Sequence, residues 1–587
     1  MLDTPKLKPP VKLSTNMRSP PCTVAPMSAD ANLDRMLHAW QSRYTGGRSP
    51  STLALAFLDW TAHAANAPFQ TSALSQKALA QWQRLAQIAM ENEEPIAPKA
   101  GDHRFAHPAW GKPPYDLLVQ SVLLAEEWCL GVMNSPDGVD AANRRIIAFA
   151  MRQWLDLISP SNMPWLNPEV IEVTRASGGA NLAAGLRNFL RDQAAAQGGA
   201  VPKDFALGVD LAATPGKVVF RNSLMELIQY APTTATVGAE PVLIVPAWIM
   251  KYYILDLSPG NSLIRWLVGQ GRTVFAISWR NPGADMRDTS LDDYRTQGVM
   301  AALDAVEAIC GNSKIHATGY CLGGTLLTIA AAAMARENDD RFATLSLFAS
   351  QTDFTESGAL QLFITEDQLN FLDDMMETQG YLTSAQMGGA FQMLRENDLV
   401  WSHAIRAYLL GEQDAPFDLM AWDADGTRLP ARMHIEYLRT LYLHNALAEG
   451  RFQVEGRSLA LDDIRLPMFL VSTERDYVAP WHSVFKMHYL NDGELTFVLT
   501  SGGHNAGIVS EPGHPRRHFR IRVRDAGART LDPDEWEHDT APREGSWWPE
   551  WEKWLERCSG PRIAPPPMGA KGFAPICDAP GQYVREE

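Results

Sequence analysis

The sequence has little cysteine for its length: six cysteines in 587 residues, with no C-x-x-C pair among them. This scarcity argues against a zinc knuckle and a disulfide framework, because both need closely spaced or paired thiols. We therefore expect no resident metal and a reducing compartment. The cysteines are Cys22, Cys129, Cys310, Cys321, Cys558 and Cys577.

Long apolar runs and an excess of basic charge are also missing. No stretch approaches the roughly 18 uninterrupted apolar residues that a membrane-spanning helix requires, and the Pro-rich N-terminus has no apolar core of signal-peptide length. Lysine and arginine number 52 against 68 aspartates and glutamates, a net charge of −16, which argues against nucleic-acid binding. We therefore expect a cytoplasmic protein with no membrane span and no nucleic-acid partner.

The chain is too long for one hydrophobic core, and the pattern of apolar residues changes near residue 205. Residues 1–30 have the composition of a disordered tail. Residues 31–205 carry apolar side chains at helical spacing, which predicts an N-terminal helical domain. Residues 206–587 alternate short β-branched runs with helical stretches, which predicts an α/β domain.

Six apolar runs are the predicted strands of this α/β domain: residues 241–248, 273–279, 315–320, 345–350, 468–474 and 496–502. Continuous apolar strands that alternate with helices predict a parallel sheet covered on both faces. Functional residues of such sheets lie just beyond the C-terminal strand ends. More than a hundred residues separate the fourth strand from the fifth, too many for an ordinary crossover. We predict that residues of about 351–455 form a cap inserted over the site.

The motif Gly-Tyr-Cys-Leu-Gly-Gly directly follows the strand at 315–320 and opens a helix. It resembles the G-x-S-x-G elbow that carries the nucleophile in the α/β-hydrolase fold, with Cys321 in place of serine. Gly319 and Gly323 leave room for the tight turn, and the dipole of the following helix favours a thiolate. The alternative for Cys321 is a buried structural cysteine. Cys310 lacks this context, so we expect it to be a core or surface thiol.

A cysteine nucleophile requires a base and a group that orients the base. In α/β-hydrolases an acid and then a histidine follow the nucleophile in the chain. Glu474 and Asp476 both follow the fifth strand, and Asp476 is better placed because it lies in the loop. His504 follows the last strand, whereas the rival base His482 lies at an apparent helix start. The order predicts a triad of Cys321, Asp476 and His504.

The negative oxygen of an acyl-transfer intermediate needs two backbone donors. We expect one to be the N–H of Leu322, and the other to come from the loop near Ala247 and Trp248. A thiol that attacks an acyl thioester exchanges one thioester for another at little thermodynamic cost. Sulfur at the elbow therefore suits acyl transfer from coenzyme A, provided that water is excluded.

Several longer stretches of the chain resemble the poly(3-hydroxyalkanoate) synthases, and the resemblance extends over roughly residues 100–587. The clearest are "KYYILDLSPGNSLIRWLVGQGRTVFAISWRNP" (251–282), "GYCLGGT" (319–325), "RENDLVWSHAIRAYLLGEQDAPFDLMAWDADGTRLP" (395–430) and "GSWWPEWEKWL" (545–555). The resemblance implies that Cys321 is the nucleophile and that Asp476 and His504 are its partners. It implies polymerisation of (R)-3-hydroxyacyl-CoA with release of coenzyme A, which makes the thioester a substrate, and we expect no cofactor.

The resemblance also implies a homodimer at the surface of cytoplasmic polymer granules, in contact with the growing polyester and with granule-associated proteins. The "GSWWPEW" segment resembles the single-subunit class that favours short-chain units such as 3-hydroxybutyryl. Arg395 matches a position suggested to meet coenzyme A; the alternative is an exposed arginine of the cap. Met250, Tyr477 and the stretch 516–527 depart from the family pattern.

Two other functions remain open for this sequence. A thioesterase or esterase of the same fold would share the triad and differ only in letting water reach the acyl-enzyme. A non-catalytic granule-associated protein would keep the fold without the reaction, although the complete set of cysteine, aspartate and histidine argues against it.

Overall fold

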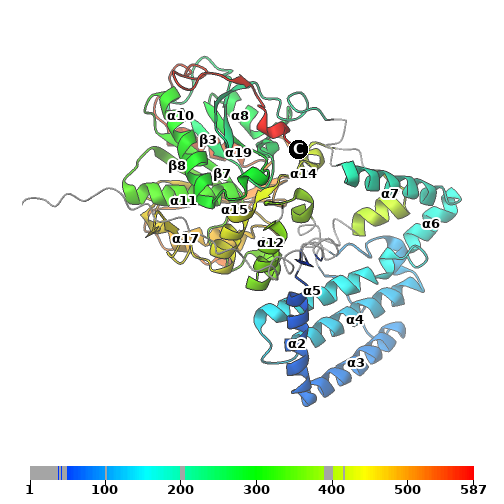
Figure 1. Ribbon diagram of the computed structural model, residues 1–587. Coiled ribbons are helices and arrows are strands. Elements are labelled where there is room, and N and C mark those ends of the chain that lie inside the picture. The colour runs from blue at the N-terminus through cyan, green and yellow to red at the C-terminus, as the bar shows by residue number, and fades with distance from the viewer. Residues whose placement is uncertain are drawn as a thin grey trace, which may run out of the picture.

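The structure is a computed structural model that describes residues 37–38, 41, 49–99, 102–198, 205–377, 379–388, 401–413 and 417–587. Two of the sequence-based predictions, the disordered tail over residues 1–30 and the role of Arg395, lie outside the described residues. Figure 1 shows a helical region beside a larger part that is built around one sheet.

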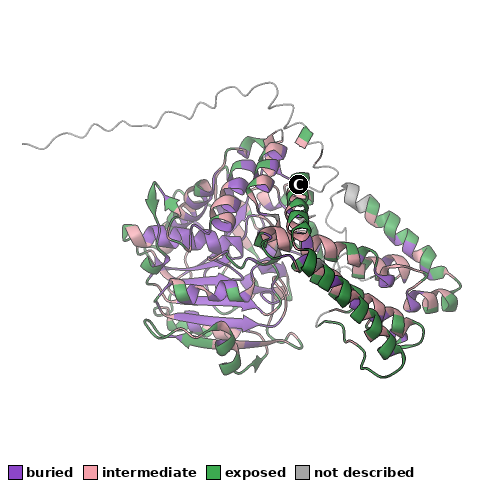
Figure 2. Cartoon of the chain, turned by 90° about the horizontal axis from the view of Figure 1, so that it is seen from below, coloured by how far each residue is buried: buried purple, intermediate pink, exposed green. Residues whose placement is uncertain are grey.

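The N-terminal helical region folds because amphipathic helices pack around two small apolar clusters. One cluster contains Ala56, Met133 and Ile147, and the other contains Trp110, Val119 and Leu123. Many residues of these helices are exposed or half-buried, whereas the central strands of the sheet are buried (Figure 2). The helices are α2 (Pro50–Ala65), α3 (Pro68–Ala89), α4 (Tyr115–Asn134), α5 (Ala141–Leu157), α6 (Pro168–Ser177) and α7 (Ala180–Gly198).

One face of α7 holds the cap. Asn181 Nδ2 donates to the carbonyl of Leu409 at 2.8 Å, and Asn188 Nδ2 donates to the carbonyl of Ala407 at 2.9 Å. Both acceptors belong to the π-helical segment η8 (Ala404–Leu409). Between these two asparagines, a Cβ atom on Gly185 would lie 1.8 Å from the carbonyl oxygen of Tyr408. Only glycine allows this approach, so the helical region and the cap are joined backbone to backbone.

The α/β part is built on an 11-stranded mixed sheet with the order β16-β15-β14-β13-β8-β7-β3-β6-β2-β1-β17. Its six central parallel strands are β3 (Val242–Val245), β6 (Val274–Trp279), β7 (Ile315–Tyr320), β8 (Phe342–Phe348), β13 (Met468–Thr473) and β14 (Leu495–Thr500). Each overlaps one of the six predicted strands. Every residue of β7 and of β13 is buried, as strands covered on both faces must be. The predicted α/β-hydrolase architecture is therefore confirmed.

The outer strands of the sheet are antiparallel, which the sequence-based prediction of an all-parallel sheet did not include. Strand β15 shows why, because "HFRIRVR" alternates arginine with apolar residues, the pattern of a strand with one wet face. The outer strands are β1 (Gly216–Arg221), β2 (Met225–Tyr230), β15 (His518–Arg524), β16 (Arg543–Glu544) and β17 (Cys577–Asp578).

Further helices pack on this sheet, among them α8 (Leu263–Gly269), α10 (Ala301–Cys310), α11 (Leu322–Glu337), α16 (Trp481–Phe485), α17 (Met487–Leu490), α18 (Pro533–Asp539) and α19 (Trp548–Arg557). The chain between β8 and β13 forms a separate set of short elements. These include α12 (Glu366–Glu377), β9 (Tyr381–Leu382), η8, α14 (Asp418–Ala424), β10 (Leu429–Pro430) and α15 (Ala431–Tyr437). We call this segment the cap.

A tryptophan-rich helix anchors the centre of the sheet. Trp551 of α19 is fully buried, its indole N–H donates to Ser346 Oγ of β8 at 2.9 Å, and its ring lies 4.9 Å from that of Phe348. Because Trp551 combines a large apolar surface with a satisfied polar atom, its contribution should be among the largest in the core.

We expect Trp551→Ala to lower the free energy of unfolding of the α/β part by about 3–5 kcal/mol, since it removes packing and leaves a cavity. Trp82→Ala is the control, because Trp82 is 70% exposed and should change stability by no more than about 0.5 kcal/mol. Urea denaturation midpoints, followed by far-UV circular dichroism, measure both. Equal shifts in the two variants would contradict this role for α19.

Candidate active site

Cys321 lies at the sharp bend between β7 and α11. Its backbone has φ 53° and ψ −130°, a positive φ that non-glycine residues rarely adopt and that is concentrated at functional sites. The Cys321 N–H donates to the carbonyl of Phe348 at 2.8 Å, and its own carbonyl accepts from the N–H of Gly324 at 2.9 Å. The side chain is buried, with 7% of the residue exposed. This is the nucleophile-elbow geometry that the motif predicts.

Two glycines make the bend possible. A Cβ atom on Gly319 would lie 2.3 Å from Cα of Gly324, so the strand and the helix could not meet. A Cβ atom on Gly323 would lie 2.2 Å from the carbonyl oxygen of Val245, the last residue of β3. The elbow is therefore pressed against the loop that begins at the end of β3.

Asp476 and His504 come together beyond the ends of β13 and β14. Asp476 Oδ2 accepts from His504 Nδ1 at 2.8 Å, and its side chain is completely buried. Asp476 Oδ1 accepts the backbone N–H groups of Val478 and Ala479 at 2.9 and 2.8 Å. With both oxygens satisfied, the carboxylate is fixed and orients the imidazole through Nδ1.

The electrostatic environment of His504 favours its protonated form. Burial by itself lowers the pKa of the imidazole, but the charges of Asp476 and Cys321 and its hydrogen bonds with them raise that pKa well above the usual 6.5. The proton on His504 is therefore stabilised by two acidic neighbours on opposite sides of the site. The dependence of the His504 pKa on Cys321 also means that the thiol and the imidazole interact.

The rival acid and base do not belong to this arrangement. Glu474 Oε1 pairs with His518 Nε2 at 2.9 Å. His482 has 46% of its side chain exposed, and its Nε2 lies 3.4 Å from Oδ1 of Asp534. Cys310 ends α10, and burial raises the pKa of its thiol to about 12. Of these candidate groups, the structure pairs Asp476 with His504, and Cys321 contributes to the raised pKa of His504.

Leu322, Ala247 and Trp248, the predicted backbone donors, lie at the start of α11 and in the loop after β3. Leu322 is the first residue of α11, and an amide at that position has no acceptor within its own helix. Ala247 and Trp248 follow Pro246, whose carbonyl oxygen is one of the atoms that Gly323 approaches most closely. The start of α11 therefore packs against the loop that carries Ala247 and Trp248.

The cap covers Cys321 with aromatic side chains that the sequence analysis did not single out. Burial is the main cause that raises the pKa values of Tyr437 and Tyr442, and the charge of Cys321 adds to it in both. The Tyr437 ring packs edge-on against Trp248, with centroids 5.9 Å apart. Thr427 Oγ1 donates to the Trp248 carbonyl at 2.9 Å. The cap thus lies directly on the loop that carries Ala247 and Trp248.

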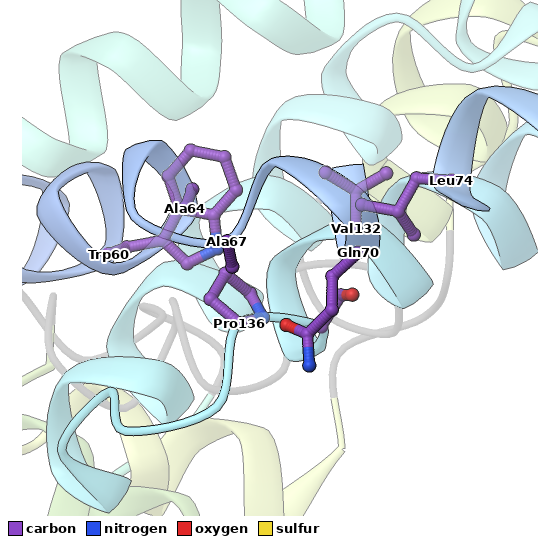
Figure 3. A pocket seen from close by; sticks show the side chains of 8 residues that line it. Trp60, Ala64, Ala67, Gln70, Leu74, Val132 and Pro136 are labelled. Atoms are coloured by element: carbon purple, nitrogen blue, oxygen red, sulfur yellow. The ribbon is translucent and has the colours of Figure 1, made fainter. Parts of the chain in front are cut away.

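A separate small cavity lies in the helical region, between α2, α3 and α4 (Figure 3). It holds about 50 Å³ and is lined by Trp60, Ala64, Ala67, Gln70, Leu74, Val132, Ser135 and Pro136. Ligand sites usually have roughly 300 Å³ or more, and this lining has no ionisable side chain. Among the described residues, no cluster of histidine, cysteine and carboxylate side chains could hold a metal ion. The described helices also include none that is long and apolar enough to span a membrane.

The fold and the site define a class: an α/β-hydrolase-fold protein with a cysteine at the nucleophile elbow and an N-terminal helical region. The α/β-hydrolase fold family matches residues 240–511. Two further families match, the poly-beta-hydroxybutyrate polymerase N-terminus over residues 101–267 and the poly-beta-hydroxybutyrate polymerase N-terminal segment over residues 28–70.

Relatives identify the family within this class. A poly(3-hydroxyalkanoate) polymerase from Methylorubrum extorquens is 41% identical over 84% of this chain and 82% of its own. A poly(3-hydroxyalkanoate) polymerase subunit from Cupriavidus necator is 34% identical over 93% of both chains. Among solved structures, a thioesterase domain from the curacin biosynthetic pathway shares 17% identity over 50% of this chain and 95% of its own, with a TM-score of 0.29. The chain belongs to the poly(3-hydroxyalkanoate) polymerase family.

Replacement of Asp476 by asparagine should lower the pKa of His504, because it removes the negative charge beside the imidazole. The direction of the pH dependence of stability follows from the raised pKa. The Asp476–His504 pair stabilises the fold fully below pH 6.5, the pKa of a free histidine. This stabilisation is lost as the pH rises through the pKa of His504 in the folded protein. Titration of the histidine Cε1 signals by ¹³C NMR, assigned with His504→Gln, measures the shift.

Glu474→Gln is the matched control for Asp476→Asn, because Glu474 is a neighbouring carboxylate that also pairs with a histidine. It should leave the titration of His504 in place. A His504 midpoint that is the same in Asp476→Asn and wild type would contradict the assigned pairing.

Proposed function

We propose that this protein polymerises (R)-3-hydroxyacyl-CoA into poly(3-hydroxyalkanoate) through an acyl thioester on Cys321, with release of coenzyme A. The observation that carries the proposal is the strained backbone at Cys321 together with the buried Asp476–His504 pair. The charge of Cys321 contributes to the raised pKa of the His504 imidazole. Membership in the polymerase family supports the reaction class and the substrate.

In the proposed reaction His504 Nε2 takes the proton of the Cys321 thiol, and the thiolate attacks the thioester carbonyl. The oxyanion accepts hydrogen bonds from the N–H of Leu322 and from Ala247 or Trp248. The C–S bond to coenzyme A then breaks, and His504 returns the proton to the departing thiolate. Asp476 keeps the imidazole oriented and stabilises its charge during both transfers.

Chain growth uses the 3-hydroxyl group of a second hydroxyacyl unit. His504 accepts the hydroxyl proton as its oxygen attacks the carbonyl of the acyl group on Cys321. The new ester bond forms, the C–S bond to Cys321 breaks, and the sulfur regains the proton. The buried aromatic cover of Tyr437, Tyr442 and Trp248 favours this alcohol over water, because it desolvates the acyl thioester.

The proposal extends to the setting of the enzyme. We propose a homodimer at cytoplasmic polymer granules, bound to the growing polyester and open to granule-associated proteins, with no cofactor and with Arg395 toward coenzyme A. These parts are supported by family membership alone. They stand or fall separately from the chemistry at Cys321.

Purified protein given 3-hydroxybutyryl-CoA should release free coenzyme A and form sedimentable polymer. Cys321→Ala should lower both by about 10⁴-fold or more, since it removes the nucleophile. Cys310→Ala is the control and should keep full activity, because that thiol is held in a protonated, buried state. Mass spectrometry of protein quenched during turnover should find a hydroxyacyl adduct on Cys321.

Two results would overturn this function. Release of coenzyme A with soluble hydroxy acid and no polymer would identify a thioesterase. Granule formation that survives unchanged in Cys321→Ala would identify a non-catalytic granule-associated protein.

The preference for short-chain units is tested with 3-hydroxyacyl-CoA substrates of graded length. We expect kcat/KM to fall as the acyl chain lengthens from four to eight or more carbons, because the "GSWWPEW" segment resembles the class that favours short-chain units. A flat or rising series would contradict the short-chain preference without affecting the proposed mechanism.

A further inference from the structure

We propose that Tyr320 and Asn505 form a positioning pair that keeps His504 in register with Cys321 through one cross-sheet hydrogen bond. The inference deepens the proposed function and rests on it, since it concerns the same nucleophile and base. Neither residue is part of the triad, and each stands beside one of its members in the chain.

The contact joins the two loops at their functional ends. Tyr320 Oη donates to Asn505 Oδ1 at 2.6 Å, and the Tyr320 ring lies 5.7 Å from that of His504. Tyr320 is the last residue of β7 and precedes Cys321, whereas Asn505 follows His504. A shift of either loop therefore alters this bond and the distance from Cys321 to His504 together.

The order of the strands explains why such a tether is needed. In the sheet, β8 and β13 separate β7, which leads to Cys321, from β14, which leads to His504. Three inter-strand spacings amount to about 14 Å, so no ladder hydrogen bond links the two loops. The bond from Asp476 fixes His504 only to the loop after β13. The bond from Tyr320 ties the His504 loop to β7 itself, in addition to the interaction of His504 with Cys321.

The surroundings of Tyr320 keep its hydroxyl a donor. Tyr320 is 2% exposed, and burial together with the negative charges of Cys321, Asp476 and Asp423 raises its pKa well above 10. The hydroxyl therefore does not ionise near neutral pH and does not serve as a general base. Its role is to hold the Asn505 side chain, since a buried hydroxyl without a partner is costly.

The test is a double-mutant cycle of Tyr320→Phe and Asn505→Leu, two near-isosteric changes that each remove one partner. We expect each single variant to lower kcat for coenzyme A release by about 10-fold, the scale of one hydrogen bond, with KM within about twofold. The double variant should be no more than about twofold worse than the singles, because the lost interaction is the same. Tyr583→Phe is the control: its hydroxyl also donates at 2.6 Å, to the Asn222 carbonyl, and it lies outside the site.

Alkylation of Cys321 by iodoacetamide provides a second measurement that needs no acyl substrate. Its rate, read by mass spectrometry on protein of verified fold, should fall in both single variants if His504 is displaced. The pairing is overturned if losses in the double variant multiply to about 100-fold, if only Tyr320→Phe loses activity, or if neither variant changes alkylation. Absence of polymer from wild-type protein would instead count against the proposed function, and the alkylation data would still decide the pairing.

Discussion

The bend at Cys321 is the constraint on which the rest of the site depends. A residue with a side chain and φ of 53° is strained by itself and persists only when its surroundings hold it. Here β7 is buried on both faces, the Cys321 amide is bonded to Phe348, and α11 begins at once. The packing of the parallel sheet therefore maintains the strained backbone at Cys321.

The cap is attached to both neighbouring parts of the molecule through polar backbone contacts. Thr427 and Trp422 bond to the carbonyls of Trp248 and Lys251 on the sheet side. On the helical side, α7 contacts η8 so closely that Gly185 has no space for a side chain. The helical region thus reaches the active site through the cap. A displacement of α7 would therefore move the cap residues over Cys321, although the described part of α7 does not itself contact the triad.

The elements nearest the chemistry could be predicted from the sequence, because their signals are local. The six apolar runs coincide with the central strands, and the residues that follow three of them are Cys321, Asp476 and His504. The antiparallel outer strands were missed because only continuous apolar runs were sought, whereas "HFRIRVR" in β15 alternates. Tyr437 and Tyr442 could be placed on a helical stretch but not over Cys321. The bond from Tyr320 to Asn505 needs knowledge of which loops meet across the sheet, and one sequence does not contain it.

The raised pKa of His504 bears on the order of proton transfers. A histidine with a raised pKa is mostly protonated in the free enzyme, so little of it is available to accept a proton, and its imidazolium form is a weaker acid than a free one. In the acyl-transfer scheme the thiol and the imidazole share one proton, so attack by sulfur leaves that proton on His504, where Asp476 stabilises it. The leaving thiolate of coenzyme A then accepts this proton from His504 in the same scheme. The more demanding step of this scheme is the attack by the 3-hydroxyl group. The alcohol must then lose its proton to His504 while the sulfur of Cys321 carries the acyl group. In the proposed scheme, acylation removes the negative charge of Cys321, which is one cause of the raised His504 pKa, so more of the imidazole is unprotonated and available to accept the proton when the hydroxyl attacks.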